Sequence, residues 1–205
     1  MKLLGSIAFL MLFISLTNAQ ILNHSDLKRQ LDSISELDQK YREILSAVGA
    51  GKAIDSLWRL QNSIDSSNIS FIKNIIDKYG YPGKTLVGVP TNEAAWYVIQ
   101  HSRKIDQFLP LIKKNGKSGQ LPFKLYAMMY DRFLVEHKKP QIYGTQITRI
   151  NMKSGINDWF VWPIRNPGKV NNLRKKAGFD QTVEDNAKAL GVQYKVIKMS
   201  EIKVQ

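Results

Sequence analysis

The chain has 205 residues and a formal net charge of +13, with 30 lysine and arginine residues against 17 aspartate and glutamate residues. The absence of cysteine excludes disulfide bonds, thiol nucleophiles and thiolate metal ligands. The charge favours anionic partners, but the basic residues are scattered and have no interleaved aromatic residues, so a solvated basic surface is favoured over a nucleic-acid interface.

Residues 1–19 follow the pattern of a signal peptide. Lys2 is their only charged residue, an apolar run occupies residues 7–14, and small or polar residues lead to Ala19. The run is shorter than the ~20 residues that a membrane-spanning helix needs, which favours cleavage over an uncleaved anchor. We therefore predict an exported protein, periplasmic or extracellular, whose residues 20–205 form a single globular domain. No later segment is apolar enough to span a membrane.

The clearest helical pattern covers residues 26–48. Its apolar residues recur every three or four positions, and Gly49 follows where a helix would end. Asp38 interrupts this apolar stripe midway between Ile34 and Tyr41. The register therefore predicts a carboxylate on the buried face of the helix.

Three further helices are predicted before residue 105. Apolar periodicity places them at residues 54–64, 71–79 and about 91–104, joined by a polar turn at 65–68 and an extended segment at 85–89. Thr91 is the expected N-cap of the last of these helices. His101 lies on its apolar face, three residues after Val98.

The C-terminal half starts helical and then becomes rich in β-branched residues. A helix at 105–113, a flexible glycine-rich connector at 114–119 and a helix from Pro122 to about residue 138 come first, and Asp131 falls among the apolar positions of that last helix. Residues 141–150 and 159–164 predict a β-hairpin around a turn at 151–157. Two short helices at 171–177 and 182–190 follow, and residues 192–199 are compatible with a last strand.

These elements predict an α+β protein that is mainly α. About five to seven helices would form the domain, with a small antiparallel β-hairpin or sheet in the C-terminal third. The chain shows no internal repeat and no low-complexity linker that would divide it.

Three polar residues occupy positions where apolar ones are expected: Asp38, His101 and Asp131. Burial of such groups without partners costs several kcal/mol, so each must be satisfied by a neighbour. If their helices pack around one core, a carboxylate would orient the imidazole, as general acid–base catalysis requires. Core residues that pair with nearby arginines are the alternative, and no metal-ligand spacing such as HExxH is present.

Six short motifs follow one another along the chain: DQKYR at 38–42, YGYP at 79–82, QH at 100–101, DR at 131–132, QIYGTQ at 141–146 and LRKKAGF at 173–179. In this order they resemble the signature of an uncharacterised bacterial family that is common in Bacteroidetes and frequently exported. The resemblance covers residues 26–180 and implies no activity and no cofactor. The chain departs from the family pattern after His101, where Ser102 and Arg103 follow in place of an acidic residue.

The resemblance singles out the same Asp38, His101 and Asp131 and adds further polar residues. These are Gln100, Arg132, Tyr143, Thr145, Gln146 and Arg174. Residues 141–146, read as a strand, would present amide, phenol and hydroxyl groups, and Gly144 would permit a close approach by a ligand or another backbone segment. Such a strand would line a pocket for a polar or anionic ligand, with an ordinary polar edge strand as the alternative.

The first functional hypothesis is a small exported acid–base enzyme, a hydrolase or a lyase. Its catalytic residues would be His101, Asp131 and Asp38, the six added residues would bind a polar or anionic substrate, and it would use no metal and no cofactor. The second hypothesis is a non-catalytic envelope protein that binds an anionic ligand or polymer. A third is an interaction module that docks through the aromatic residues at 159–162. The sequence predicts no oligomeric state.

Overall fold

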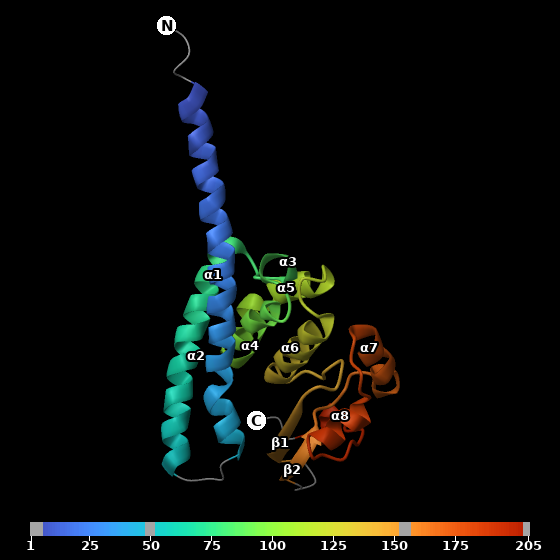
Figure 1. Ribbon diagram of the computed structural model, residues 1–205. Helices are drawn as coiled ribbons and strands as arrows, with labels where there is room; N and C mark the ends of the chain where they lie inside the picture. The colour runs from blue at the N-terminus through green and yellow to red at the C-terminus, as the bar shows by residue number, and fades with distance from the viewer. Residues whose placement is uncertain (1–5, 48–51, 152–156, 203–205) are drawn as a thin grey trace. The chain divides into compact units, whose positions relative to one another are not determined.

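The computed structural model describes residues 6–47, 52–151 and 157–202 (Figure 1). The chain divides into two compact units, residues 1–102 and 103–205. The first unit is helical, and the second combines helices with a two-stranded sheet. The prediction of a single domain over residues 20–205 stays a prediction.

Two long helices form the frame of the first unit. Helix α1 (Ser6–Ala47) packs along α2 (Lys52–Tyr79), and both contact α4 (Ala94–His101) (Figure 1). The predicted stripe is confirmed at Leu27, Leu31 and Ile34 of α1, which are buried at spacings of four and three residues, whereas Tyr41 further along is only half-buried. Asp38, one turn further along, is buried on the same stripe.

Helix α1 also contains the described part of the predicted signal peptide and the predicted cleavage point before Gln20. Within the described ranges, none of the helices combines the length and the apolar character that a membrane crossing requires.

The prediction of two helices separated by a turn at 65–68 was wrong, since α2 is continuous through this segment. The serines that suggested a turn bond back to the helix instead: Ser66 Oγ donates to Asn62 O at 2.8 Å, and Ser70 Oγ donates to Ser66 O at 2.9 Å. Such i−4 bonds let hydroxyl side chains remain inside a helix. Asp65, which the prediction also placed in the turn, forms side-chain contacts that are described below.

The segment that leads into α4 also differs from its prediction. Residues 85–89 were expected to be extended, but Lys84–Val87 form the single helical turn α3, because the backbone N–H groups of residues 86–88 bond to the carbonyls of residues 83 and 84. Thr91 starts the 3-10 helix η1 (Thr91–Glu93) and is not a side-chain cap. Its hydroxyl donates to Asp32 of α1 at 2.6 Å instead.

Helices α5 (Ile105–Lys117) and α6 (Phe123–Glu136) pack together at the start of the second unit. The predicted helix from Pro122 is confirmed. The prediction of a flexible connector at 114–119 was wrong over residues 114–117, because α5 continues to Lys117 and buries Gly116 against the Cβ of Tyr126.

The sheet of the second unit is a two-stranded antiparallel hairpin. Strand β1 (Ile147–Asn151) pairs with β2 (Asn157–Val161), in a register that places Ile147 opposite Val161. The first strand starts six residues later than predicted, and the predicted turn lies mostly outside the described residues. Phe160 of β2 and Trp162, which follows the strand, are buried with Ile202, so Trp159, 51% exposed, is the aromatic residue of segment 159–162 that remains open for docking.

The second unit ends with short elements. The 3-10 turn η2 (Pro167–Lys169) leads to α7 (Val170–Ala177), and α8 (Val183–Ala189) follows, capped by the Thr182 hydroxyl. Within the described residues, segment 192–199 forms no strand, contrary to that expectation, and only the 3-10 turn η3 (Met199–Glu201) follows it. The predicted fold class is confirmed: the protein is mainly helical, with one small antiparallel sheet in its C-terminal third.

Candidate functional site

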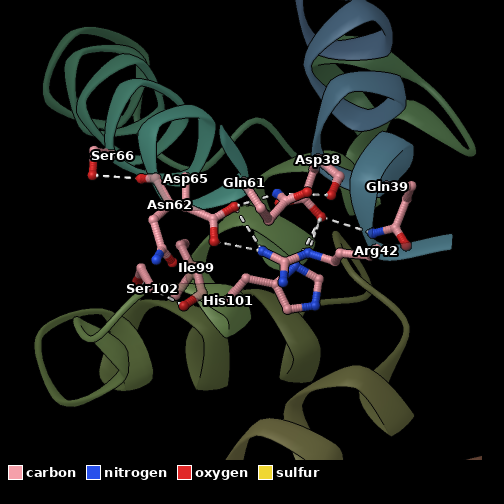
Figure 2. Close-up of polar contacts among 10 residues, drawn as sticks. All are labelled: Asp38, Gln39, Arg42, Gln61, Asn62, Asp65, Ser66, Ile99, His101 and Ser102. Atoms are coloured by element: carbon pink, nitrogen blue, oxygen red, sulfur yellow. Dashed lines mark hydrogen bonds and ion pairs between the residues drawn. The ribbon is translucent and has the colours of Figure 1, made fainter. Parts of the chain in front are cut away.

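Asp38 is the centre of a polar cluster inside the first unit (Figure 2). Its side chain points from α1 toward α2 and α4, where its Oδ2 atom lies 2.8 Å from His101 Nδ1 and accepts a hydrogen bond of 2.7 Å from Gln39 Nε2. The carboxylate is buried, whereas the imidazole keeps 16% of its side-chain surface exposed. A buried carboxylate therefore supports an imidazole that solvent can reach.

His101 is the last residue of α4. The helix ends there because the following residue, Ser102, donates both its N–H and its hydroxyl to Ile99 O. With Nδ1 facing a carboxylate, the neutral ring carries its proton on Nδ1 and leaves a lone pair on Nε2. Nε2 has no hydrogen-bond partner among the residues that the structure describes, so this atom is available for proton transfer.

A second carboxylate completes the cluster. Arg42 Nη2 lies 2.6 Å and 2.7 Å from the two oxygens of Asp65, and Arg42 Nε lies 3.7 Å from Asp38 Oδ2. Gln61 Nε2 donates to Asp65 Oδ1 at 2.7 Å and to the backbone carbonyl of Asp38 at 3.3 Å. Arg42 and Gln61 thus link the two carboxylate residues, and they hold α1 and α2 in one register.

Three buried atoms of this cluster have no hydrogen-bond partner within the described residues. They are Asp38 Oδ1, Arg42 Nε and Gln61 Oε1. Buried polar atoms without partners are uncommon in folded proteins and often mark functional positions. Here they leave one donor and two acceptors for a water molecule or a substrate group.

A surface hollow of about 890 Å³ runs along α1 beside this cluster. Its lining includes Glu36, Leu37, Gln39, Lys40 and Glu43. Gln39 is the link between the two features, because its amide lines the hollow and also donates to Asp38.

Asp131 is buried in the second unit, on α6. Its carboxylate accepts hydrogen bonds from the backbone N–H groups of Ile142, Tyr143 and Thr145 at 2.7 to 3.1 Å, and one from Thr145 Oγ1 at 3.0 Å. Burial raises the pKa of Asp131, and these hydrogen bonds oppose the rise. The carboxylate therefore shapes the segment that follows α6.

Residues 141–146 were predicted to be a strand, and that prediction was wrong. They form a loop whose backbone is bound by buried side chains, since Gln141 accepts from Gln146 N at 3.0 Å and donates to the carbonyls of Gln146 and Trp162. Arg174 Nη1 also donates to Tyr143 O at 2.9 Å. Gly144 adopts a φ of +67°, and its backbone packs directly against Val183.

The predicted site residues thus belong to two groups. Asp38 and His101 pair in the first unit, where Gln100 is half-buried next to His101 on α4. In the second unit, Tyr143, Thr145 and Gln146 belong to the 141–146 loop, and Asp131 and Arg174 bind its backbone. Arg132 lies apart from this group, at the surface, where its Nε is 3.2 Å from Glu136 Oε1.

Sequence reasoning missed Gln61 and Asp65. A signal existed, because Gln61, Asp65, Asn68 and Ile72 follow one another at spacings of four and three residues, which places them on one face of a continuous helix. No cluster of three or more histidine, aspartate or glutamate residues suited to a metal ion occurs in the described part of the chain.

One family model matches residues 25–197 and is described as a family of unknown function. The match includes every residue of both groups and begins after the predicted signal peptide. No curated protein and no solved structure matches the chain.

Proposed function

We propose that this chain, which belongs to the family of unknown function DUF6624, is a small exported acid–base enzyme of the hydrolase or lyase class. The observation that carries the proposal is the 2.8 Å contact between His101 Nδ1 and the buried carboxylate of Asp38. The pair joins an imidazole that solvent reaches to a carboxylate that water does not, which is the arrangement of a general base and its orienting residue.

His101 Nε2 would accept the proton, from water in a hydrolase or from a substrate carbon in a lyase. Asp38 would fix the tautomer and lie beside the positive charge that develops on the ring. Arg42, held by both oxygens of Asp65, would keep the Asp38 carboxylate in place through its Nε atom, 3.7 Å away. Asp38, Arg42 and Asp65 are therefore positioning residues in this proposal.

The substrate would be polar or anionic, in keeping with the net charge of +13. Asp131, predicted as a catalytic carboxylate, holds the 141–146 loop of the second unit by its hydrogen bonds to Tyr143 and Thr145. Its catalytic role and the binding roles of Tyr143, Thr145 and Gln146 stay predictions and are not part of the proposal for His101.

The test is turnover by the wild type and by His101→Gln. Chromogenic esters, phosphomonoesters and glycosides report hydrolysis, and anionic polysaccharides report elimination through the absorbance of the unsaturated product. On any substrate that the wild type turns over, we expect His101→Gln to lower kcat by about a hundredfold or more, because general acid–base catalysis contributes that much.

His137→Gln is the matched control, since His137 also lies beside an aspartate, Asp106 at 3.2 Å, but on the exposed surface of the second unit. This variant should keep the wild-type kcat. Equal losses in the two variants, or full turnover in His101→Gln, would contradict the role proposed for His101.

A non-catalytic envelope protein that binds an anionic ligand is the second candidate, favoured by the same excess of positive charge. The two candidates differ at His101. A binding protein keeps most of its affinity in His101→Gln, whereas the enzyme loses turnover.

Export is part of the proposal and has its own test. Expressed with its full N-terminus in a bacterial host, the protein should be recovered outside the cytoplasm with Gln20 as its first residue, as read by N-terminal sequencing. Ala19→Arg should block processing, because signal peptidase requires a small residue there, while Asn18→Ala should be processed normally. Recovery of unprocessed wild-type chain in the cytoplasm would refute export.

A further inference from the structure

A second pocket lies within the second unit, beside the 141–146 loop. Its volume is about 360 Å³, in the lower range of small-molecule sites. The lining includes Lys124 of α6, Thr145 of the loop, Arg174 of α7, the segment around Phe179 and Asp180, and Asn186 of α8. Three helices and a loop thus contribute to one concave surface.

Arg174 is the most constrained of these residues. It is only 1% exposed, its Nε donates to Gln181 O and its Nη1 to Tyr143 O, both at 2.9 Å. The ring of Phe179 lies 4.5 Å from the guanidinium carbon. The plane of the guanidinium is therefore fixed, and Nη2 has no hydrogen-bond partner among the described residues.

Both partners of the Arg174 guanidinium are neutral carbonyls, and within the described residues it forms no ion pair. Burial lowers the pKa of Arg174, while the more distant charges of Asp131, Glu184 and Asp185 raise it. A buried cation without a contacting counter-ion is costly, so an anion that reaches Nη2 would be stabilised there.

The other lining residues restrict the chemical class of ligand that the pocket can bind. Lys124 forms no ion pair among the described residues and adds a second positive charge, whereas Asp180 brings one negative charge to the same lining. The Thr145 hydroxyl already donates to Asp131, so the charged donors left for a ligand are Arg174 and Lys124. Phe179 and Met128 offer apolar surface to the remainder of a ligand.

We propose that this pocket binds a small molecule through a compact oxyanion group, a carboxylate or a phosphate, held by Arg174 Nη2 and the Lys124 ammonium. A guanidinium and an ammonium are the charged donors that proteins commonly use to bind either group. Binding at this pocket needs no turnover, so the proposal does not depend on the function proposed for His101.

The test is a titration of the purified protein with inorganic phosphate and, separately, with acetate, followed by ¹H–¹⁵N NMR at constant ionic strength. Saturable shifts are expected at Thr145, Phe179 and Asn186. Saturation by phosphate alone would identify a phosphate site, and saturation by acetate alone would identify a carboxylate site. His101→Gln should bind like the wild type, so failure of the acid–base proposal would leave this result unchanged.

Two lysine variants distinguish binding at this pocket from nonspecific attraction to the basic surface. Lys124→Gln should raise the Kd about tenfold, because it removes one charged hydrogen bond to the anion. Lys176→Gln removes an exposed charge of α7 outside the pocket and should leave the Kd unchanged. Arg174→Lys should weaken binding further if its spectrum shows a folded unit. The proposal is overturned if neither anion saturates these residues, or if Lys124→Gln and Lys176→Gln weaken binding equally.

Discussion

Asp131→Ala will lower the free energy of unfolding of the second unit by at least about 3 kcal/mol, because each buried donor left unpaired costs about 1–3 kcal/mol. Four donors lose their acceptor in this variant: the N–H groups of Ile142, Tyr143 and Thr145 and the Thr145 hydroxyl. Chemical denaturation followed by circular dichroism measures the change.

The neighbouring substitution Arg132→Ala is the matched control. Arg132 lies on the same helix, but its contact with Glu136 is an exposed pair four residues apart, worth at most about 0.5 kcal/mol. Similar losses in Asp131→Ala and Arg132→Ala would show that the 141–146 loop keeps its structure without the carboxylate. Asp131→Asn should fall between the two, since it keeps one acceptor oxygen and places an amide donor against the backbone N–H groups.

Gly144→Ala is expected to cost about 2–5 kcal/mol, the sum of two penalties. A φ of +67° costs an L-residue about 1–2 kcal/mol, and overpacking a core adds about 1–3 kcal/mol. A Cβ at this position would lie 2.6 Å from Val183 Cγ2 and 2.8 Å from Ile164 Cδ1, distances at which the neighbours must move. Thermal and chemical denaturation both report the loss.

Substitution of Gly119 measures the backbone penalty alone, because its φ is +72° and no neighbouring atom lies within 4 Å of a Cβ added there. Gly119→Ala should therefore cost only the backbone penalty, about 1–2 kcal/mol. In a Val183→Ala background the cost of Gly144→Ala should fall, because the nearest clashing atom is gone. A Gly144→Ala variant no less stable than Gly119→Ala would refute the steric argument.

Helical periodicity found the buried carboxylates because their positions depend on local sequence alone. Asp38 continues the stripe of Leu27, Leu31 and Ile34, and the structure buries it together with them. The same reasoning failed at residues 141–146, where β-branched and aromatic residues predicted a strand. The backbone there bonds to Asp131 and Arg174, which lie 11 to 31 residues away, and local pattern carries no information about such partners.

Helical periodicity predicted that Asp38 and His101 both face the core, but it could not predict that they contact each other. The two residues are 63 positions apart, and their contact depends on how α1 packs against α4. The family pattern suggested an acidic residue just after the histidine, a place occupied here by Ser102 and Arg103. The carboxylate beside His101 comes from α1 instead, so the departure from the pattern does not leave the imidazole without an acid partner.

In the loop at 141–146, the main-chain atoms and the side chains make different contacts. Main-chain groups of the loop bind Asp131, Gln141 and Arg174, while the Tyr143 ring packs against Phe179 and the Gln146 amide donates to Thr145 Oγ1. Exchanging those two side chains for others would leave these main-chain hydrogen bonds in place. A loop held in this way can tolerate side-chain substitutions among related proteins while its course stays fixed.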